Sequence, residues 1–519
     1  MKRRTLLGAL AAAAGVAVPF AGGWRGSTST GLLLPSRRPL PPPFAVPLPI
    51  PPVLRPVRTD ADGEHYEVVQ RVARAEILPG VATEIWGYNG SFPGPTIVSR
   101  SGRPIVVRHR NELPVPTVAH LHGGRTPAAS DGYPTDLLLP AGGGGDHAAH
   151  MPGMFDEHAV IRTGEREYRY PMRQPAGTLW YHDHRMDFTG PSVWRGLAGF
   201  HLVTDAAEDE VPLPRGGRDL PLMLVDRSFG PDGELLYPSL DPALVRPGVR
   251  DGFGAGVLGD VILVNGAPWP VAEVDGARYR LRLLNASNAC RYRLVLDPPP
   301  PGGGGFVQVG ADGGLLERPV RHDAVELAPA QRFDVVVDFG RYRTGQEVTV
   351  LNAFGAGGTA RVMRFRVVRA AADDTAVPAT LPGEPGLTAG LAAGRGVPAR
   401  TMRFRHDVIG GRPGWTVNGV PFAPDAVHAR VGRGAVEVWR LTSDFHHPVH
   451  LHGATFRVLA RSNSGPGAYD AGWRDTLDLR PAEQATIVAR FGEEPGRYVM
   501  HCHNLEHEDM AMMGNVVVT

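Results

Sequence analysis

"HCHNLEHEDMAMM", residues 501–513, gathers three histidines, three methionines and one of the only two cysteines in the 519-residue chain. The apolar run "RYVM" precedes it, so the motif begins on a predicted strand. Side chains at positions i and i+2 of a strand point to one face, which places His501 and His503 on one face and Cys502 on the other. Imidazole and thiolate together favour copper, zinc or iron. The stretch therefore predicts a metal site.

Histidine pairs of this kind recur along the chain. Twenty histidines placed at random among 519 residues would give fewer than one His-x-His pair, yet the chain has four. Each pair follows an apolar stretch, so each predicts a strand that offers two imidazoles side by side. The pairs are His120 and His122 in "HLHG", His182 and His184 in "WYHDH", His450 and His452 in "HLHG", and His501 and His503 in "HCH".

The composition limits the class of protein. The 66 glycines and 50 prolines lie between short apolar runs, which predicts an all-β fold of many strands and turns. A net charge of +1 gives a nucleic-acid partner no electrostatic support. Two cysteines cannot form a disulfide framework, and the alternating pattern around Cys290 predicts a small buried residue, which leaves Cys502 free as a ligand. After the N-terminus, no stretch approaches the ~20 apolar residues of a membrane-spanning helix.

The N-terminus reads "MKRRTLLGALAAAAGVAVPFAGG". A basic start, an apolar stretch and small residues afterwards predict a signal peptide over residues 1–21. Arg3 and Arg4 are followed by "TLL", which resembles the twin-arginine signal of bacterial proteins that are exported folded. We therefore expect an exported protein, periplasmic or extracellular.

A second repeat predicts the domain organisation. "YNGSFPGP" begins at Tyr88, "VNGAPWP" at Val264 and "VNGVPFAP" at Val417, and each Asn-Gly before a proline predicts a turn between strands. Three copies of one β-domain are expected: domain 1 over residues 22–205, domain 2 over 206–369 and, after a linker over 370–398, domain 3 over 399–519. The proline-rich residues 40–56 are interpreted as a strap over domain 1, with a disordered linker as the alternative.

The four histidine pairs belong to the first and third domains only. If all eight imidazoles serve one site, that site lies between the two terminal domains, and domain 2 is a spacer.

Together the four motifs resemble those of the multicopper oxidases, from about residue 45 to the end. "HLHGGRTPAASDGYP" (120–134), "VDRSF" (225–229) and "HEDMAMM" are most similar to the bacterial spore-coat laccase and phenoxazinone synthase branch. The resemblance implies three cupredoxin-like Greek-key β-barrel domains and four copper ions per chain. It also implies an oxidase that couples one-electron oxidation of phenols or aminophenols to the reduction of dioxygen to water.

The resemblance also implies the ligand set. Two histidines, one cysteine and a weak axial methionine form the ligand set of a blue copper ion. The family pattern places type 1 copper on His447, Cys502, His507 and Met512, type 2 copper on His120 and His450, and the type 3 pair on His122, His182, His184, His452, His501 and His503.

Several neighbouring residues leave alternatives open. His446 could replace His447 as the type 1 ligand, although the "HPVHLHG" register favours His447. Met510 and Met513 flank the axial position and are interpreted as packing residues. The loop "AGGGGDHAAHMPGMFDEH", which holds the His- and Met-rich residues 147–158, is either solvated or an auxiliary copper site.

Acidic residues near the motifs are candidates for proton supply and orientation. In the resembling branch, acids at the positions of Glu508 and Asp131 line channels to the copper cluster, so both are candidate catalytic residues, with a turn-capping role as the alternative for Asp131. Asp183 is expected to accept a hydrogen bond from a ligand histidine. Asp475 is expected to pair with a nearby arginine.

Alternative functions remain within and outside the enzyme class. A cuprous-ion oxidase would carry a methionine-rich segment near type 1 copper, and domain 3 has none. A copper nitrite reductase would be shorter, and a copper-free exported scaffold would have lost its ligands. We expect a monomer whose partners are dioxygen and a small aromatic donor, a phenol, aminophenol or tetrapyrrole that reaches type 1 histidines near the surface.

Overall fold

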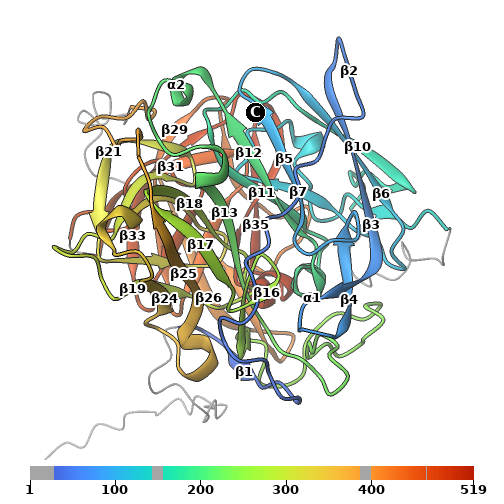
Figure 1. Cartoon of the computed structure of the whole chain (residues 1–519). Helices are drawn as coiled ribbons and strands as arrows, with labels where there is room; N and C mark the ends of the chain where they lie inside the picture. The colour runs from blue at the N-terminus through green and yellow to red at the C-terminus, as the bar shows by residue number, and fades with distance from the viewer. Residues whose placement is uncertain (1–28, 143–155, 386–398, 463) are drawn as a thin grey trace, which may run out of the picture.

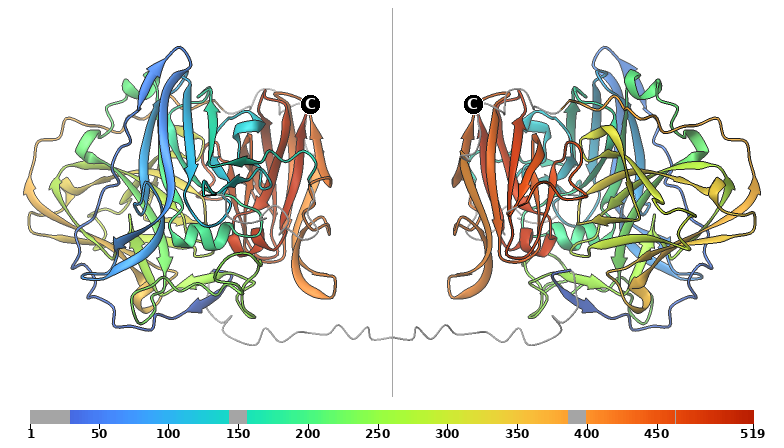
Figure 2. Two further views of the ribbon diagram at one scale, coloured as in Figure 1. Left: turned by 90° about the vertical axis from the view of Figure 1, so that its right-hand side faces the viewer. Right: turned by 90° about the vertical axis from the view of Figure 1, so that its left-hand side faces the viewer.

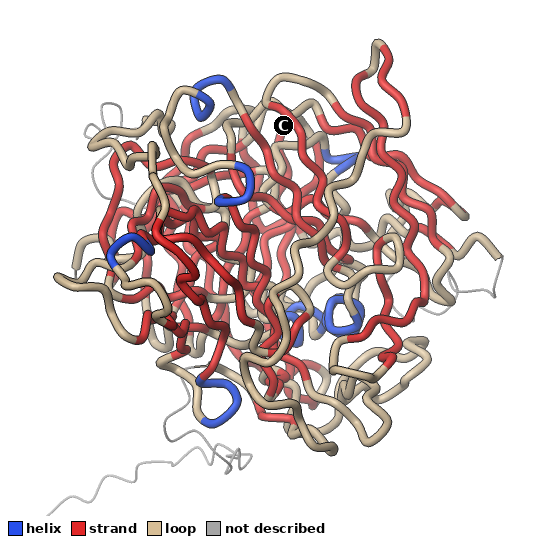
Figure 3. The backbone as a smooth tube through the Cα atoms, in the orientation of Figure 1, coloured by secondary structure: helices blue, strands red, loops and turns tan. Residues whose placement is uncertain are grey.

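Strands are the main regular secondary structure of the computed structural model, which describes residues 29–142, 156–385, 399–462 and 464–519 (Figures 1 and 3). Six principal sheets fall into three pairs along the sequence. The predicted all-β class is therefore correct. The predicted signal peptide lies outside the described residues. No helix among those described has the length and apolar character needed to cross a membrane.

The first pair of sheets forms the domain 1 sandwich. One sheet has the order β10 (Glu165–Tyr170), β6 (Ile105–Asn111), β3 (Gly63–Glu76) and β2 (Arg58–Asp60), with β4 (Ala82–Tyr88) also paired to β3. The other has the order β5 (Gly94–Arg100), β12 (Ala198–Thr204), β11 (Gly177–Asp183) and β7 (Ala119–His122).

The second pair forms domain 2. Its larger sheet has the order β16 (Ala267–Pro268), β15 (Val261–Val264), β13 (Asp219–Arg227), β18 (Arg278–Asn285), β23 (Arg332–Asp338), β20 (Phe306–Ala311) and β21 (Gly314–His322). Its smaller sheet has the order β17 (Val271–Gly276), β25 (Arg361–Ala370), β24 (Glu347–Asn352), β19 (Tyr292–Asp297) and β22 (Ala324–Leu327).

The third pair forms domain 3. One sheet has the order β27 (Arg412–Val417), β26 (Arg400–Ile409), β29 (Val436–Ser443), β33 (Gln484–Phe491) and β31 (Ala454–Arg461). The other has the order β28 (Val427–Val431), β35 (Met513–Val518), β34 (Gly496–Cys502), β30 (His447–Leu451) and β32 (Thr476–Leu479). Figure 2 shows these orange and red strands beside the blue and teal strands of domain 1.

Short elements complete the fold. Two small sheets pair β1 (Leu32–Leu34) with β14 (Val257–Gly259) and β8 (Leu138–Leu139) with β9 (Arg162–Thr163). Among the described residues the α-helices are α1 (Thr189–Arg195), α2 (Ala206–Asp209) and α4 (Leu505–Asp509), and the 3-10 helices are η1 (Ala128–Ser130), η3 (Gly216–Arg218), η4 (Phe339–Arg341) and η5 (Gly357–Ala360).

One topology is repeated three times. Each of the six sheets contains a single parallel pair among antiparallel ones. In the first sheet of each domain the pair is β3 with β6, β13 with β18, and β26 with β29. In the second sheet it is β5 with β12, β17 with β25, and β28 with β35. The sequence repeat therefore corresponds to a repeated fold, although the boundaries at residues 205, 369 and 399 stay predictions.

The Asn-Gly repeat supplies the same turn in every domain. Asn89, Asn265 and Asn418 have φ values of 54°, 51° and 56°, in the left-handed region that asparagine tolerates. Each side-chain oxygen accepts the amide of the neighbouring first strand, from Val69, Met223 and Arg403 respectively. Each turn is therefore hydrogen-bonded to the antiparallel strand beside it, which is β3, β13 and β26 respectively.

Two segments outside the sheets tie the domains together. The proline-rich residues 40–56 form an ordered strap, as favoured, but it crosses domain 2 before domain 1. Its Leu48 amide donates to Val271 and its Leu54 amide donates to Thr96. In the linker, Glu384 accepts hydrogen bonds from Arg125 of domain 1 and Arg490 of domain 3. Residues 386–398 of the linker lie outside the described part.

The Asn-Gly turns give a stability prediction. Asn265 is 2% exposed, and its side chain also donates to the carbonyls of Pro49 and Pro221. We expect Asn265→Ala to lower the free energy of unfolding by about 3 kcal/mol, because buried backbone groups lose their partners. The matched control is Asn418→Ala, which places alanine at a similar positive φ on the surface. Denaturant unfolding should show a loss for Asn418→Ala of about 1 kcal/mol or less, and equal losses would contradict the account.

Candidate metal centre

Four strand ends carry the histidine pairs to one place between domains 1 and 3. His120 and His122 lie on β7, which pairs with β11 so that His182 stands opposite His120. In domain 3, β30 pairs with β34 so that His450 stands opposite His501. The remaining histidines follow directly on the strand ends. All eight imidazoles are at most 3% exposed: those of His120, His122, His182, His184, His450, His452, His501 and His503.

The ring nitrogens of these histidines approach within metal-binding distance. His452 Nε2 lies 3.1 Å and His184 Nε2 lies 3.3 Å from His501 Nε2. Three groups have ligand atoms within 4.8 Å of one another: His120 with His450 and His452, His120 with His122 and His182, and His184 with His452 and His501. The cluster thus offers overlapping sites for several ions.

The inward nitrogens fit a bound metal. The Nε2 atoms of His120, His182 and His450 are buried and lack a hydrogen-bond partner among the described residues. A buried polar atom without a partner is costly, so a group of them facing one another indicates ligands for an ion. Burial also lowers the pKa of His182 and His450 to about 3, so both rings are neutral, as metal binding requires.

The outward nitrogens are held by the protein. The Nδ1 atoms of His120, His182 and His450 lie 2.5, 2.8 and 2.9 Å from the main-chain carbonyls of Asp131, Asp183 and Asp475. A proton on Nδ1 that donates to a carbonyl leaves the lone pair on Nε2, directed at the cluster. The backbone therefore sets the tautomer of these ligands before any ion binds.

A second, smaller cluster lies within domain 3. Cys502 Sγ lies 3.5 Å from Nδ1 of both His447 and His507, and these two nitrogens are 3.1 Å apart. Met512 is fully buried in the same apolar cluster as Cys502. His446 is outside this group, and its Nδ1 lies 3.9 Å from Asp478 Oδ1. The structure therefore agrees with the choice of His447 that the sequence register favours.

Alternation along β34 connects the two clusters. Its last residue, Cys502, belongs to the smaller cluster, whereas the flanking His501 belongs to the larger one. Burial raises the pKa of the Cys502 thiol well above its ordinary value, so a nearby cation is needed to ionise it.

Both candidate acids lie at the larger cluster. Glu508 is buried, with Oε2 3.1 Å from His501 Nδ1 and Oε1 3.7 Å from His184 Nδ1. Asp131 Oδ2 lies 2.7 Å from His452 Nδ1, and its Oδ1 accepts a hydrogen bond from Thr126. Asp131 also follows η1 as its C-terminal cap, so the turn-capping role and the contact with the cluster coexist.

Two expectations about aspartates have different outcomes. Asp475 pairs with Arg332, as expected, and its Oδ1 also lies 3.1 Å from His122 Nε2. The side-chain role expected for Asp183 is wrong. Its carboxylate accepts the backbone amide of Val118, and its main-chain carbonyl, not the side chain, holds a histidine. An aspartate at a strand end offers a carboxylate and a main-chain carbonyl as acceptors, and the sequence pattern does not show which of the two contacts the histidine.

Domain 2 is more than the expected spacer, and the two type 1 histidines, which were expected near the surface, lie beneath covering residues. His447 and His507 are both 0% exposed. His507 Nε2 lies 3.1 Å from the carbonyl of Ala255, and Trp415 stacks on its ring at 3.6 Å between centroids. Ala255 and Arg332 come from domain 2, so this domain covers one cluster and braces the other.

The methionines and the glycine-rich loop are accounted for in part. Met513 is buried in a small cluster with Tyr133 and Met186, and Met510 packs half-buried against the domain 3 core, so both are packing residues. Most of the His- and Met-rich segment falls in residues 143–155, outside the described part. His158 is described and is exposed.

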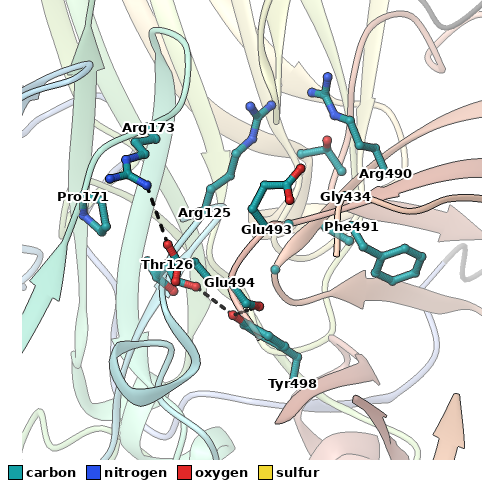
Figure 4. A pocket seen from close by; sticks show the side chains of 14 residues that line it. Arg125, Thr126, Pro171, Arg173, Gly434, Arg490, Phe491, Glu493, Glu494 and Tyr498 are labelled. Carbon is teal, nitrogen blue, oxygen red and sulfur yellow. Dashed lines mark hydrogen bonds and ion pairs between the residues drawn. The ribbon is translucent and has the colours of Figure 1, made fainter. Parts of the chain in front are cut away.

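A cavity of about 290 Å³ opens at the seam between domains 1 and 3 (Figure 4). Arg125 and Thr126 line it from domain 1, and Arg490 and Tyr498 line it from domain 3. The Tyr498 hydroxyl donates to the carbonyl of Thr126, whose own hydroxyl donates to Asp131. The cavity therefore reaches within two hydrogen bonds of the larger cluster.

Comparisons with known proteins agree with this geometry. Two family models described as multicopper oxidase match residues 70–143 with 146–208, and residues 398–519. The chain is 37% identical to a laccase of Bacillus stratosphericus over 91% of its length and 98% of that protein. It is 34% identical to a bilirubin oxidase of Albifimbria verrucaria, over 91% and 80% of the two chains. The crystal structure of a multi-copper oxidase from Pediococcus acidilactici matches with a TM-score of 0.78 and 30% identity, over 94% and 93% of the chains. The sequence-based assignment is thus confirmed: the chain belongs to the multicopper oxidase family.

Proposed function

We propose that the protein is a laccase-like oxidase in which the smaller cluster holds type 1 copper and the eight-histidine cluster holds three further ions. As a family member it is a copper-dependent oxidoreductase with dioxygen as acceptor. The observation that carries the proposal is the complete set of buried imidazoles with a cysteine between two of them. Its twelve ligands are His447, Cys502, His507 and Met512 for type 1; His120 and His450 for type 2; and His122, His182, His184, His452, His501 and His503 for type 3.

The bound copper ions supply the one-electron steps that take electrons from a donor and pass them to dioxygen. The chain supplies the path and the surroundings. Cys502 is joined to His501 through a single peptide unit, which gives the shortest covalent route between the clusters. The ligand side chains of both clusters are buried, so bulk water is excluded from the metal-binding positions.

Dioxygen reduction to water also consumes four protons. Glu508 lies beside His501 and His184, and Asp131 lies beside His452, which makes these the acids best placed to bring protons to the cluster. Asp131 further orients two histidines, one through each of its carbonyl and carboxylate groups.

The donor is proposed to be a small aromatic such as a phenol or aminophenol, in keeping with the laccase and bilirubin oxidase relatives. A copper-free scaffold is disfavoured, because such a protein would have no reason to keep buried, unpartnered imidazoles. Nothing in the described residues favours a cuprous-ion oxidase. Export by the twin-arginine route is proposed from residues 1–21 alone, and a monomeric state stays a prediction.

The function is tested by metal analysis and oxygen uptake. We expect four copper ions per chain, an intense thiolate-to-copper absorption near 600 nm, and one dioxygen consumed for every four electrons taken from a phenol. Metal analysis that finds zinc, or a single copper ion per chain, would contradict the assignment.

The two cysteines provide a matched test of the electron path. Cys502→Ser should abolish the blue absorption and phenol oxidation, yet leave the copper of the histidine cluster bound, because all eight imidazoles remain. Cys290→Ser, at the other buried cysteine, should retain both colour and activity. Phenol oxidation by Cys502→Ser at a rate near that of the wild type would refute the path.

The axial position is tested by the reduction potential. Met512→Leu should keep copper bound and raise the potential by roughly 60 mV or more, a tenfold shift of a one-electron couple toward Cu(I). Met513→Leu is the control and should leave the potential unchanged. The reverse pattern would assign the axial ligand to Met513.

A further inference from the structure

Residues 254–257 of domain 2 form a covering segment over the part of domain 3 that carries His507. The Ala255 carbonyl lies 3.1 Å from His507 Nε2 and accepts a hydrogen bond of the same length from Asn504. The other ring nitrogen of His507, Nδ1, faces Cys502 Sγ. When Nδ1 binds a metal ion, Nε2 carries the ring proton and donates it to the Ala255 carbonyl. Two further bonds join the covering segment to domain 3, from Trp415 Nε1 to the Gly254 carbonyl and from the Val257 amide to Glu506.

A second part of the chain, residues 29–37, packs against the same covering segment. Its strand β1 pairs in parallel with β14, which begins at Val257 inside the covering segment. The Leu32 amide donates to the Gly256 carbonyl at 2.9 Å, one residue away from Ala255. In Figure 1, β1 is the dark-blue strand near the bottom of the molecule. The covering segment therefore has partners in domain 3 and in residues 29–37.

The two segments meet backbone to backbone at a pair of glycines. Gly31 and Gly256 have φ values of 151° and 137°, which side-chain-bearing residues rarely adopt. A Cβ atom on Gly31 would lie 2.8 Å from the Gly256 carbonyl oxygen, and one on Gly256 would lie 2.4 Å from the carbonyl oxygen of Thr30. No side chain separates the segments at this point, so a displacement of residues 29–37 is passed directly to the covering segment.

Residues 29–37 are themselves anchored to domain 2 at both ends. At one end, the Ser29 hydroxyl accepts the amide of Arg291 at 2.9 Å. At the other, the amide and the hydroxyl of Ser36 both donate to the carboxylate of Asp260. Between them, Leu34 is only 5% exposed. These contacts give residues 29–37 a fixed position from which to hold the covering segment.

We propose that residues 29–37 are a positioning segment for the type 1 site: they hold the Ala255 carbonyl against His507 and thereby tune the copper ion that His507 binds. The inference rests on the proposed function. A carbonyl that accepts a hydrogen bond from an imidazole makes the ring a stronger electron donor. A stronger donor favours Cu(II) over Cu(I). Loosening residues 29–37 should therefore raise the reduction potential of type 1 copper.

The first test uses Gly31→Ala in the copper-loaded, full-length protein. Its Cβ atom pushes against Gly256 and loosens the contact between the two segments. In a redox titration of the blue absorption, we expect the equilibrium to move roughly threefold to tenfold toward Cu(I), about 30 to 60 mV, the scale of one lost hydrogen bond. The EPR signal of type 2 copper in the same samples should be unchanged. An unchanged potential in folded, blue Gly31→Ala would overturn the proposal.

The matched control is Gly345→Ala in domain 2. Gly345 has a φ of 84°, so alanine is strained there as well, but an added Cβ has none of the described atoms within 4 Å. This variant should lose stability and keep the potential of the wild type. An equal rise in potential would show that general destabilisation, and not the position of Ala255, changes the copper ion, and would contradict the proposal.

A second measurement needs no metal. In the copper-free protein, hydrogen exchange of a peptide that contains residues 254–257 should be about tenfold faster in Gly31→Ala. In Gly345→Ala it should match the wild type. Unchanged exchange in Gly31→Ala would show that residues 29–37 do not hold the covering segment, and would overturn the proposal. Absence of a blue band in the copper-loaded wild-type protein would instead count against the proposed function.

A milder variant keeps the test decisive if Gly31→Ala does not fold. Ser36→Ala removes the hydroxyl that donates to Asp260 and leaves the contact between Gly31 and Gly256 in place. It should raise the type 1 potential in the same direction, by about threefold toward Cu(I) or less, and speed exchange of the covering segment. Wild-type values of both quantities in Ser36→Ala would count against the proposal.

Discussion

The opposed directions of neighbouring side chains on β34 are the constraint on which the metal centre depends. Because Cys502 faces one way and His501 the other, a single strand end supplies ligands to two clusters without any intervening side chain. The distance between the clusters is therefore set by the backbone of one strand. Such a backbone is rigid only inside a sheet, and β34 is paired on both sides, with β30 and β35.

The larger cluster imposes a second constraint, on the arrangement of domains. Half of its imidazoles come from β7 and β11 of domain 1 and half from the strand ends of domain 3, so small movements between the domains would separate the ligands. Interdomain bonds oppose such movement: Tyr133 donates to Asn515, Tyr498 donates to Thr126, and Arg497 pairs with Asp156. Arg332 of domain 2 adds a buried pair with Asp475, which touches His122. The metal centre is thus a property of the whole assembly.

Local patterns predicted what local geometry determines. The His-x-His pairs and the choice of His447 over His446 follow from spacing along one strand, where side-chain direction is fixed by the period of two. The Asn-Gly turns follow from the backbone preferences of those two residues. The cover on His507 could not be predicted, because Ala255 is an ordinary alanine that contributes only its main-chain carbonyl across a domain interface. Trp415 was missed for a related reason: a tryptophan in a strand pattern is equally typical of a core. The error over Asp183 arose because a carbonyl can do what a carboxylate was expected to do.

The partners of the outward nitrogens show how the buried centre communicates with its surroundings. Main-chain carbonyls contact the outward nitrogens of His120, His182, His450 and His507. A carbonyl is uncharged, so it fixes the tautomer of the ring but does not carry a proton. Carboxylates contact the outward nitrogens of His122, His447 and His452, and His501 Nδ1 lies 3.1 Å from both Glu508 Oε2 and the Cys502 carbonyl. Asp475, at His122, is neutralised by Arg332 and is enclosed. Asp131, at His452, continues through Thr126 to the cavity at the domain seam, and Asp444, at His447, continues to solvent. The two carboxylates that lead outward thus lie at different clusters, Asp131 at the larger and Asp444 at the smaller.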